Sequence, residues 1–143
     1  MLSNVKLTAA NVPHKESLTT EEKATLWKNI SSALIETGRP GIKRLLNWMQ
    51  SDCGNGVMNY VNAPASTKYH GNYPGGLMEH SWNVYVWLTI IVGNANSMKD
   101  ADAQLKNEES KAMMDSAAIV ALLHDICKVG FYSMEPKNRK TYD

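Results

Sequence analysis

The sequence predicts an all-α fold, and three features indicate it. Apolar residues recur at steps of three and four in four separate segments, while no segment alternates apolar and polar side chains over the length of a strand. Thr19 followed by Glu22 is a typical helix-start signal. With 143 residues the chain can form one domain with a substantial core. We expect this domain at residues 19–143, after a loosely ordered lead-in at residues 1–18.

The first two predicted helices lie on either side of Gly38. The first follows the Thr19 cap and ends before this glycine. The second is expected to begin at Pro40, because proline fits the first turn of a helix. The residues on its apolar face are Ile42, Leu45, Leu46 and Met49. Residues 53–56, Cys-Gly-Asn-Gly, have the composition of a turn that ends this helix.

Two further helices are predicted after an irregular but ordered connection at residues 57–76. The third runs from about Leu77 to Val92 and stops at Gly93, and the fourth runs from about Lys111 to Lys128. Charged residues between 95 and 110 indicate an exposed loop. The apolar side of the third helix is formed by His80, Val84, Trp87, Leu88 and Ile91. The inner side of the fourth is formed by Met114, Ala117, Ala118, Ala121, His124 and Asp125.

Charge and hydropathy exclude several classes of protein. The net charge of +1 provides no general attraction to nucleic acid or an anionic membrane. The longest apolar stretch, at about residues 84–92, is roughly half the length of a membrane-spanning helix. The first residues lack the basic and apolar blocks of a signal peptide. Cys53 and Cys127 show no paired spacing, which is typical of reduced thiols. We therefore expect a cytoplasmic protein without a membrane partner.

Two segments contain the candidate site residues: TKYHGNYPGGLMEHS at residues 67–81 and LLHDICKVG at residues 122–130. His124 and Asp125 are adjacent on the fourth predicted helix, so a cation beside that turn could contact both side chains. Lys128 lies one turn further on the face of His124. Packing of the two apolar helix faces would bring His80 to this pair. From the residues alone, a metal site and a buried core histidine explain His80 equally well.

The glycines and the lysine have ordinary explanations next to the functional ones. Gly75 and Gly76 precede a helix, where their amides could bind an anion, although they could equally provide only a tight turn. The ammonium group of Lys128 could offset phosphate charge beside a metal, or it could complement the helix dipole from an exposed position.

HGNYPGGLMEHS, followed some forty residues later by ALLHDICKVG, resembles the HD-domain superfamily of metal-dependent phosphohydrolases. The resemblance covers about residues 64–132 and implies an HD-domain-like helical bundle. The family pattern places a histidine on one helix, a His-Asp pair on a later helix and a further aspartate downstream. The lead-in HGNYPGGL also resembles HD domains of bacterial and phage proteins, including a bacterial 3′-to-5′ exoribonuclease.

This resemblance implies a role for each matching residue. His80, His124 and Asp125 would bind a divalent cation such as Mn²⁺, Fe²⁺, Co²⁺, Ni²⁺ or Mg²⁺, and Asp125 would also act as general base. Lys128 would face the substrate phosphate. His70 matches a histidine of some subfamilies only, where it contacts substrate or a second metal. The implied substrate is a nucleotide or a related small phosphate ester.

The chain departs from the family pattern at the downstream aspartate. Asp143 is the last residue and follows a polar, basic segment without helical periodicity. We therefore expect a truncated domain whose C-terminal part is missing. Two alternatives stay open. A non-catalytic HD fold for ligand binding or assembly is favoured by the missing aspartate. A single-strand 3′-to-5′ nuclease is disfavoured by the near-zero net charge.

Overall fold

The computed structural model describes residues 17–97 and 107–133, and these residues confirm the all-α fold. The helices are α1 (Thr20–Glu36), α2 (Ile42–Gln50), α3 (Gly76–Ser97) and α4 (Asn107–Leu123), and a 3₁₀ turn follows at Ile126–Lys128. Within the two described stretches no strand forms, and extended pairing is limited to an isolated bridge between Val57 and Ser133. No helix of these stretches has the length and apolar character needed to cross a membrane.

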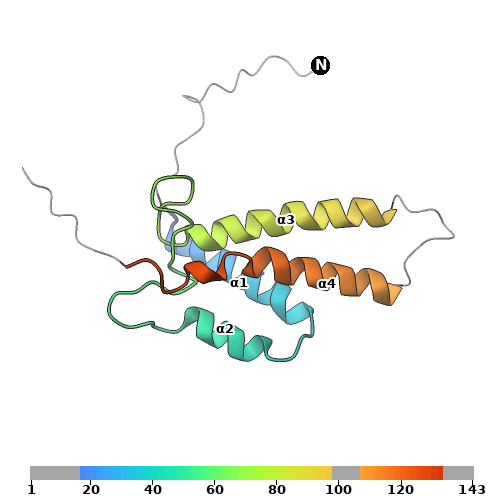
Figure 1. The fold of residues 1–143 in the computed structure, drawn as a ribbon, viewed down its shortest axis with the longest axis horizontal. Coiled ribbons are helices and arrows are strands. Elements are labelled where there is room, and N and C mark those ends of the chain that lie inside the picture. The colour runs from blue at the N-terminus through green and yellow to red at the C-terminus, as the bar shows by residue number, and fades with distance from the viewer. Residues whose placement is uncertain (1–16, 98–106, 134–143) are drawn as a thin grey trace, which may run out of the picture.

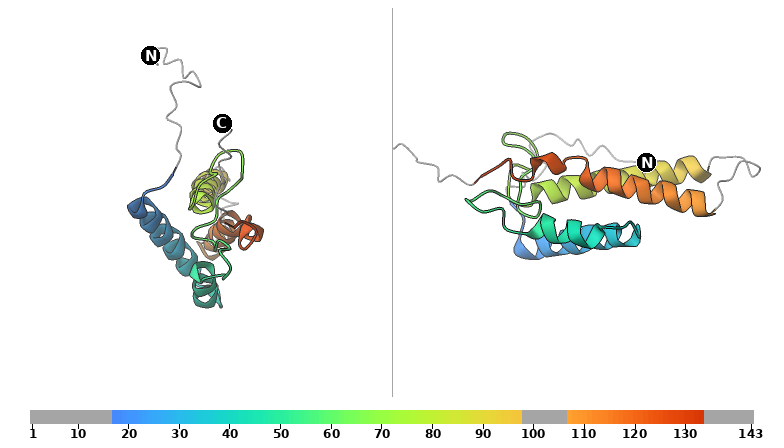
Figure 2. Two further views of the ribbon diagram at one scale, coloured as in Figure 1. Left: turned by 90° about the vertical axis from the view of Figure 1, so that its left-hand side faces the viewer. Right: turned by 60° about the horizontal axis from the view of Figure 1, so that its bottom comes forward.

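Helices α3 and α4 form a long antiparallel pair, and α1 and α2 pack along one side of it (Figure 1). The right-hand view of Figure 2 shows that α1 and α2 lie beside the part of the pair where α3 begins and α4 ends, and that they do not reach its other end. The core lies between these elements. Its large, fully buried hydrophobic side chains are Ile30, Leu34, Met49, Tyr60, Leu77, Met78 and Leu122.

The start of α1 is as predicted, whereas the start of α2 is not. The Thr19 hydroxyl accepts a hydrogen bond from the Glu22 amide at 3.1 Å, and the Glu22 carboxylate accepts one from the Thr19 amide at 3.2 Å. This reciprocal pair confirms the capping box. Helix α2 begins at Ile42 rather than at Pro40. The reason is Gly41, whose φ of 87° lies in the left-handed region and cannot be part of a helix.

The bounds of α3 and α4 also differ from the prediction. Helix α3 continues through Gly93 to Ser97, because a helical glycine costs only about 1 kcal/mol and α3 is supported by its packing against α4. Helix α4 begins at Asn107 and ends at Leu123, well before the predicted end at Lys128. The expected loop at 95–110 therefore contributes to both helices, and its residues 98–106 lie outside the described residues. So do residues 1–16 of the expected lead-in and residues 134–143.

Part of the predicted apolar face of α3 is not buried. Trp87 is 67% exposed and Ile91 is 61% exposed, whereas Val84 and Leu88 are partly buried. Both exposed residues belong to the second half of α3, whereas its core residues Leu77 and Met78 belong to its first turn. The sequence period identifies an apolar helix but does not show how many neighbours cover it.

The connection between α2 and α3 is ordered without regular secondary structure, as predicted. Backbone hydrogen bonds stabilise the connection internally and attach it to α3 and to the segment after α4. The Ala65 amide donates to the Gly71 carbonyl at 2.8 Å, and the Leu77 amide of α3 donates to the Ala63 carbonyl at 3.0 Å. The Gly130 amide donates to the Met58 carbonyl at 3.0 Å. The connection therefore joins the start of α3 to the segment that follows α4.

Candidate metal centre

The His-Asp pair lies in the turn between α4 and the 3₁₀ helix. The prediction that the pair lies within the fourth helix is therefore wrong. Ending a helix leaves its last carbonyls without intrahelical partners. Two of these carbonyls face side-chain donors instead. His124 Nδ1 lies 2.8 Å from the Ala121 carbonyl oxygen, and the Tyr60 hydroxyl donates to the Leu122 carbonyl at 2.9 Å. These contacts replace the helical hydrogen bonds that are lost where α4 ends. His124 and Asp125 therefore lie in the turn without leaving these two carbonyls unpaired.

The contact with Ala121 determines which nitrogen of His124 faces the site. A carbonyl oxygen only accepts hydrogen bonds, so His124 Nδ1 carries a proton in this contact. In the neutral ring, Nε2 then presents its lone pair. His124 is therefore held in the tautomer in which Nε2 can bind a cation.

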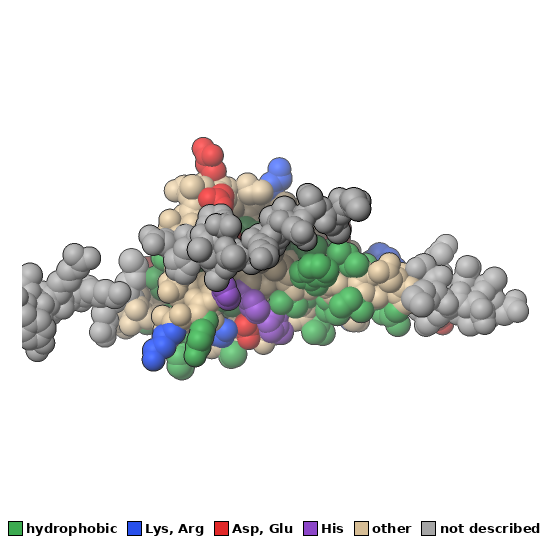
Figure 3. Space-filling model, turned by 90° about the horizontal axis from the view of Figure 1, so that it is seen from above, with side chains coloured by type: hydrophobic (Ala, Val, Ile, Leu, Met, Phe, Trp, Pro, Cys, Tyr) green, Lys and Arg blue, Asp and Glu red, His purple; other side chains and the backbone are tan. Residues whose placement is uncertain are grey.

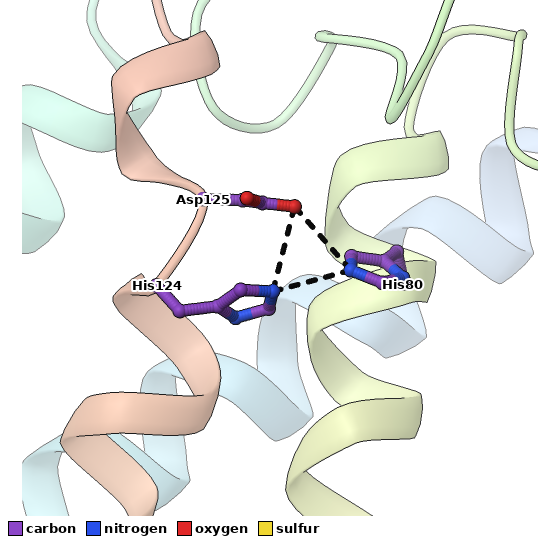
Figure 4. A group of neighbouring side chains, drawn as sticks. All are labelled: His80, His124 and Asp125. Atoms are coloured by element: carbon purple, nitrogen blue, oxygen red, sulfur yellow. Dashed lines mark hydrogen bonds and ion pairs between the residues drawn. The ribbon is translucent and has the colours of Figure 1, made fainter.

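His80, His124 and Asp125 point toward one another from α3 and from the end of α4 (Figure 4). His80 Nε2 lies 3.2 Å from His124 Nε2, and Asp125 Oδ2 lies 3.3 Å from His80 Nε2 and 3.4 Å from His124 Nε2. Adjacent ligands of an octahedral cation with bonds of about 2.1 Å are separated by roughly 3 Å. The three atoms could thus form one face of a coordination shell. The structure brings together the residues that the sequence pairs, and their binding of a metal stays a prediction.

The three side chains are accessible from solvent. Histidine side chains gather on one face of the molecule, beside acidic and basic groups (Figure 3). The exposed fraction is 43% for the His80 side chain, 33% for His124 and 22% for Asp125. A cation could therefore reach the triad directly and keep other ligands on its outer side.

Burial lowers the pKa of His80 below the ordinary value of a histidine. The Asp125 carboxylate opposes this shift, while His124 and Lys128 add to it. At neutral pH we therefore expect a neutral His80, which is the form that binds metal ions. Because His124 Nε2 and Asp125 Oδ2 both accept, the proton between the side chains belongs to His80 Nε2.

Lys128 connects the triad to the connection between α2 and α3. Its ammonium lies 3.1 Å from Asp125 Oδ2 and donates to the Ala65 carbonyl at 2.6 Å. The side chain is 28% exposed, so it is not the freely exposed helix-end lysine of the alternative explanation. Two of its three donor protons are used in these contacts, and the third could bind an anionic ligand.

The remaining predicted site residues are not members of the triad. His70 is exposed in the turn at residues 66–71, and among the described residues no hydrogen bond or ion pair joins its imidazole to the triad. For Gly75 and Gly76, the structure does not support the explanation in which their amides bind an anion. Both residues are buried, and their amides donate to the carbonyls of Asn62 at 3.2 Å and Tyr73 at 2.9 Å. The structure instead favours the tight-turn explanation, with Gly75 at a φ of 87°.

Tyr60 is a site residue that the sequence does not reveal. Its side chain is fully buried and packs against Trp27, with ring centroids 6.5 Å apart. Burial raises the pKa of Tyr60 to about 12, the Asp125 carboxylate adds to the rise, and the Ser81 hydroxyl offsets part of it. Ser81 Oγ is buried, and among the described residues no partner meets the geometric criteria for a hydrogen bond to it. The connection has no sequence period that could place Tyr60 near α4.

The raised pKa of Tyr60 predicts a loss of stability at alkaline pH. Between pH 10 and 12 the unfolded chain releases a proton that the folded chain keeps, so the free energy of unfolding falls as pH rises. Tyr60→Phe should remove this contribution. The stability difference between wild type and variant should shrink by roughly 1–2 kcal/mol from about pH 9 to about pH 11.5, measured by urea unfolding. A constant difference over this range would contradict the prediction.

Two imidazole nitrogens, a carboxylate oxygen and an ammonium form a set that could hold a divalent cation and an anionic ligand beside it.

Comparison of the chain with protein-family models, with curated proteins and with solved structures finds no match. The resemblance to the HD-domain superfamily therefore stays a prediction.

Proposed function

We propose that the protein is an HD-type, metal-dependent phosphohydrolase that acts on a nucleotide or a related small phosphate ester in the cytoplasm. The observation that supports this is the triangle of His80 Nε2, His124 Nε2 and Asp125 Oδ2 with the Lys128 ammonium 3.1 Å from the carboxylate oxygen. Nitrogen and oxygen ligands of this kind suit Mn²⁺, Fe²⁺, Co²⁺, Ni²⁺ or Mg²⁺. Both described cysteines are free, which supports a reducing compartment.

The protein residues would divide the work between holding the cation and moving a proton. His124 would bind through Nε2, with its ring fixed by the Ala121 carbonyl. His80 would bind through Nε2 after its proton moves to Nδ1. The bound cation would supply Lewis acidity and an acidified water. The Asp125 carboxylate would accept a proton from the attacking water.

Lys128 would act on the substrate. Its third donor proton would bind a phosphoryl oxygen, and its charge would offset the negative charge that develops at phosphorus. The Ala65 carbonyl holds this ammonium in place at 2.6 Å, which fixes it before substrate arrives.

A second function is supported by one observation. Among the described residues, Asp125 is the only carboxylate of the triad. Asp143 lies outside the described residues. A site of this composition would suit a non-catalytic HD-type module that binds a metal and a phosphate ligand without turnover. No comparable feature of the described residues supports a single-strand nuclease.

Hydrolysis assays with metal-free protein test the proposal. With nucleotides and aryl phosphate esters as substrates, added Mn²⁺ should be required for phosphate release. Asp125→Asn should lower the rate at least about 100-fold, because the neutral amide can neither bind the cation as strongly nor accept the proton. Asp115→Asn is the matched control, since this carboxylate pairs with Lys111 at 2.7 Å on α4.

The outcomes separate the two functions. Metal-dependent hydrolysis that disappears in Asp125→Asn alone supports the enzyme. Metal binding without hydrolysis of any tested ester supports the binding module. Absence of metal binding contradicts both.

A further inference from the structure

The buried phenol of Tyr60 interacts with residues next to the triad on both α3 and α4. Along α3, the neighbouring Ser81 is the residue that follows His80. At the end of α4, its hydrogen-bond acceptor Leu122 is two residues before His124. On the basis of the metal site proposed above, we propose that Tyr60 is a positioning residue that holds His124 and Asp125 in the metal-binding arrangement.

The end of α4 shows why such a residue is needed. In a continuing α-helix the Leu122 carbonyl would accept from the amide of Ile126. The helix ends at Leu123, and Ile126 belongs to the 3₁₀ turn. The Tyr60 hydroxyl supplies the missing donor at 2.9 Å. The backbone can then leave the helical path at His124 without a buried, unpaired carbonyl.

The same connection contacts the His-Asp segment a second time. The Ala65 carbonyl accepts from Lys128, whose ammonium also contacts Asp125. The connection thus binds the segment before the pair through Tyr60 and after it through Ala65. A turn fixed on both sides keeps the imidazole and the carboxylate at the separation that the cation requires.

Tyr73 provides a matched control for a purely structural role. It is also a buried tyrosine of the connection, and its hydroxyl donates to the Glu79 carboxylate in the first turn of α3. Replacing Tyr73 by phenylalanine removes a hydrogen bond to the first turn of α3, whereas Tyr60→Phe removes a hydrogen bond to the end of α4. A general cost of losing such a hydroxyl should therefore affect both variants.

The experiment measures Mn²⁺ affinity of the full chain by titration calorimetry, for wild type, Tyr60→Phe and Tyr73→Phe. Urea unfolding of the metal-free proteins is measured in parallel. We expect both variants to lose stability. Tyr60→Phe should weaken Mn²⁺ binding roughly 10–100-fold, as found when groups that orient metal ligands are removed, whereas Tyr73→Phe should bind within about twofold of wild type. The absorption spectrum of bound Co²⁺ should also change in Tyr60→Phe only.

Each other outcome overturns the proposal. A folded Tyr60→Phe protein with wild-type affinity and Co²⁺ spectrum shows that the phenol does not position the ligands, while the metal centre itself stands. Equal losses of affinity in both variants show a general structural cost. A Tyr60→Phe chain that does not fold even with excess Mn²⁺ shows a requirement for the fold as such. Wild type that binds neither metal overturns the proposed function, a result that is distinct from the others.

Discussion

Gly76→Ala is expected to destabilise the fold by about 3 kcal/mol or more, at the upper end of what overpacking costs. A Cβ at this position would lie 2.0 Å from the Gly71 carbonyl oxygen and 2.7 Å from its carbonyl carbon. Both are backbone atoms, which cannot rotate away as the end of a side chain can. The turn before α3 would have to move to admit a single methyl group.

Gly93→Ala is the matched control because it places the same substitution in the same helix. Among the described residues, and apart from its own helix backbone and chain neighbours, a Cβ at Gly93 meets no atom within 4 Å. There the alanine should stabilise the protein by about 0.5–1 kcal/mol through its higher helix propensity. Urea unfolding of both variants measures the two changes, which should have opposite signs. A similar small gain in both would show that the contact between Gly71 and Gly76 does not restrict the fold.

The effect of Gly76→Ala should reach the site as well. The Gly71 carbonyl accepts from the Ala65 amide, and the Ala65 carbonyl binds the Lys128 ammonium. Displacing Gly71 therefore disturbs the position of the lysine beside Asp125. We expect weaker phosphate-ester hydrolysis in any Gly76→Ala protein that remains folded.

His124→Ala is expected to weaken Mn²⁺ binding at least about 100-fold, since it removes one of the three ligand atoms and not merely a group that orients one. The Ala121 carbonyl also loses its contact with the ring, so a small loss of metal-free stability should accompany the change. Calorimetric titration and metal analysis after dialysis measure the affinity. His80→Ala should give a similar loss.

His70→Ala is the control that removes a histidine from outside the triad. His70 is exposed in the turn at residues 66–71, so its removal should change Mn²⁺ affinity by less than about twofold. If His70→Ala and His124→Ala weakened binding equally, the cation would not be held by the triad.

Local signals explain which parts of the fold the sequence could predict. The cap of α1 depends on Thr19 and Glu22, which are three residues apart and act without any tertiary contact. The end of α4 depends on Tyr60, which belongs to a distant segment. Residues 124–128 contain neither glycine nor proline, so nothing in the local sequence indicates that the helix stops at Leu123.

The candidate site divides in the same way. The sequence could predict that His80 lies near the His-Asp pair, because both belong to helices whose apolar faces are expected to pack against each other. It could not predict the contact of Lys128 with Ala65, because the connection between α2 and α3 has no period from which its path follows. The sequence could not decide between the two explanations of Gly75 and Gly76 for a related reason, since their amides pair with carbonyls of that same connection.

The hydrogen bonds that fasten this connection also suggest an order of folding. The contacts between α3 and α4 join helices that follow one another along the chain, whereas the pairing of Met58 with Gly130 and Tyr132 closes a longer stretch of chain at a higher entropic cost. We expect the α3–α4 pair to be formed early and this closure to be a late event. Mutations at Met58 would then mainly speed unfolding, and the His-Asp turn would reach its final geometry only in the last step of folding.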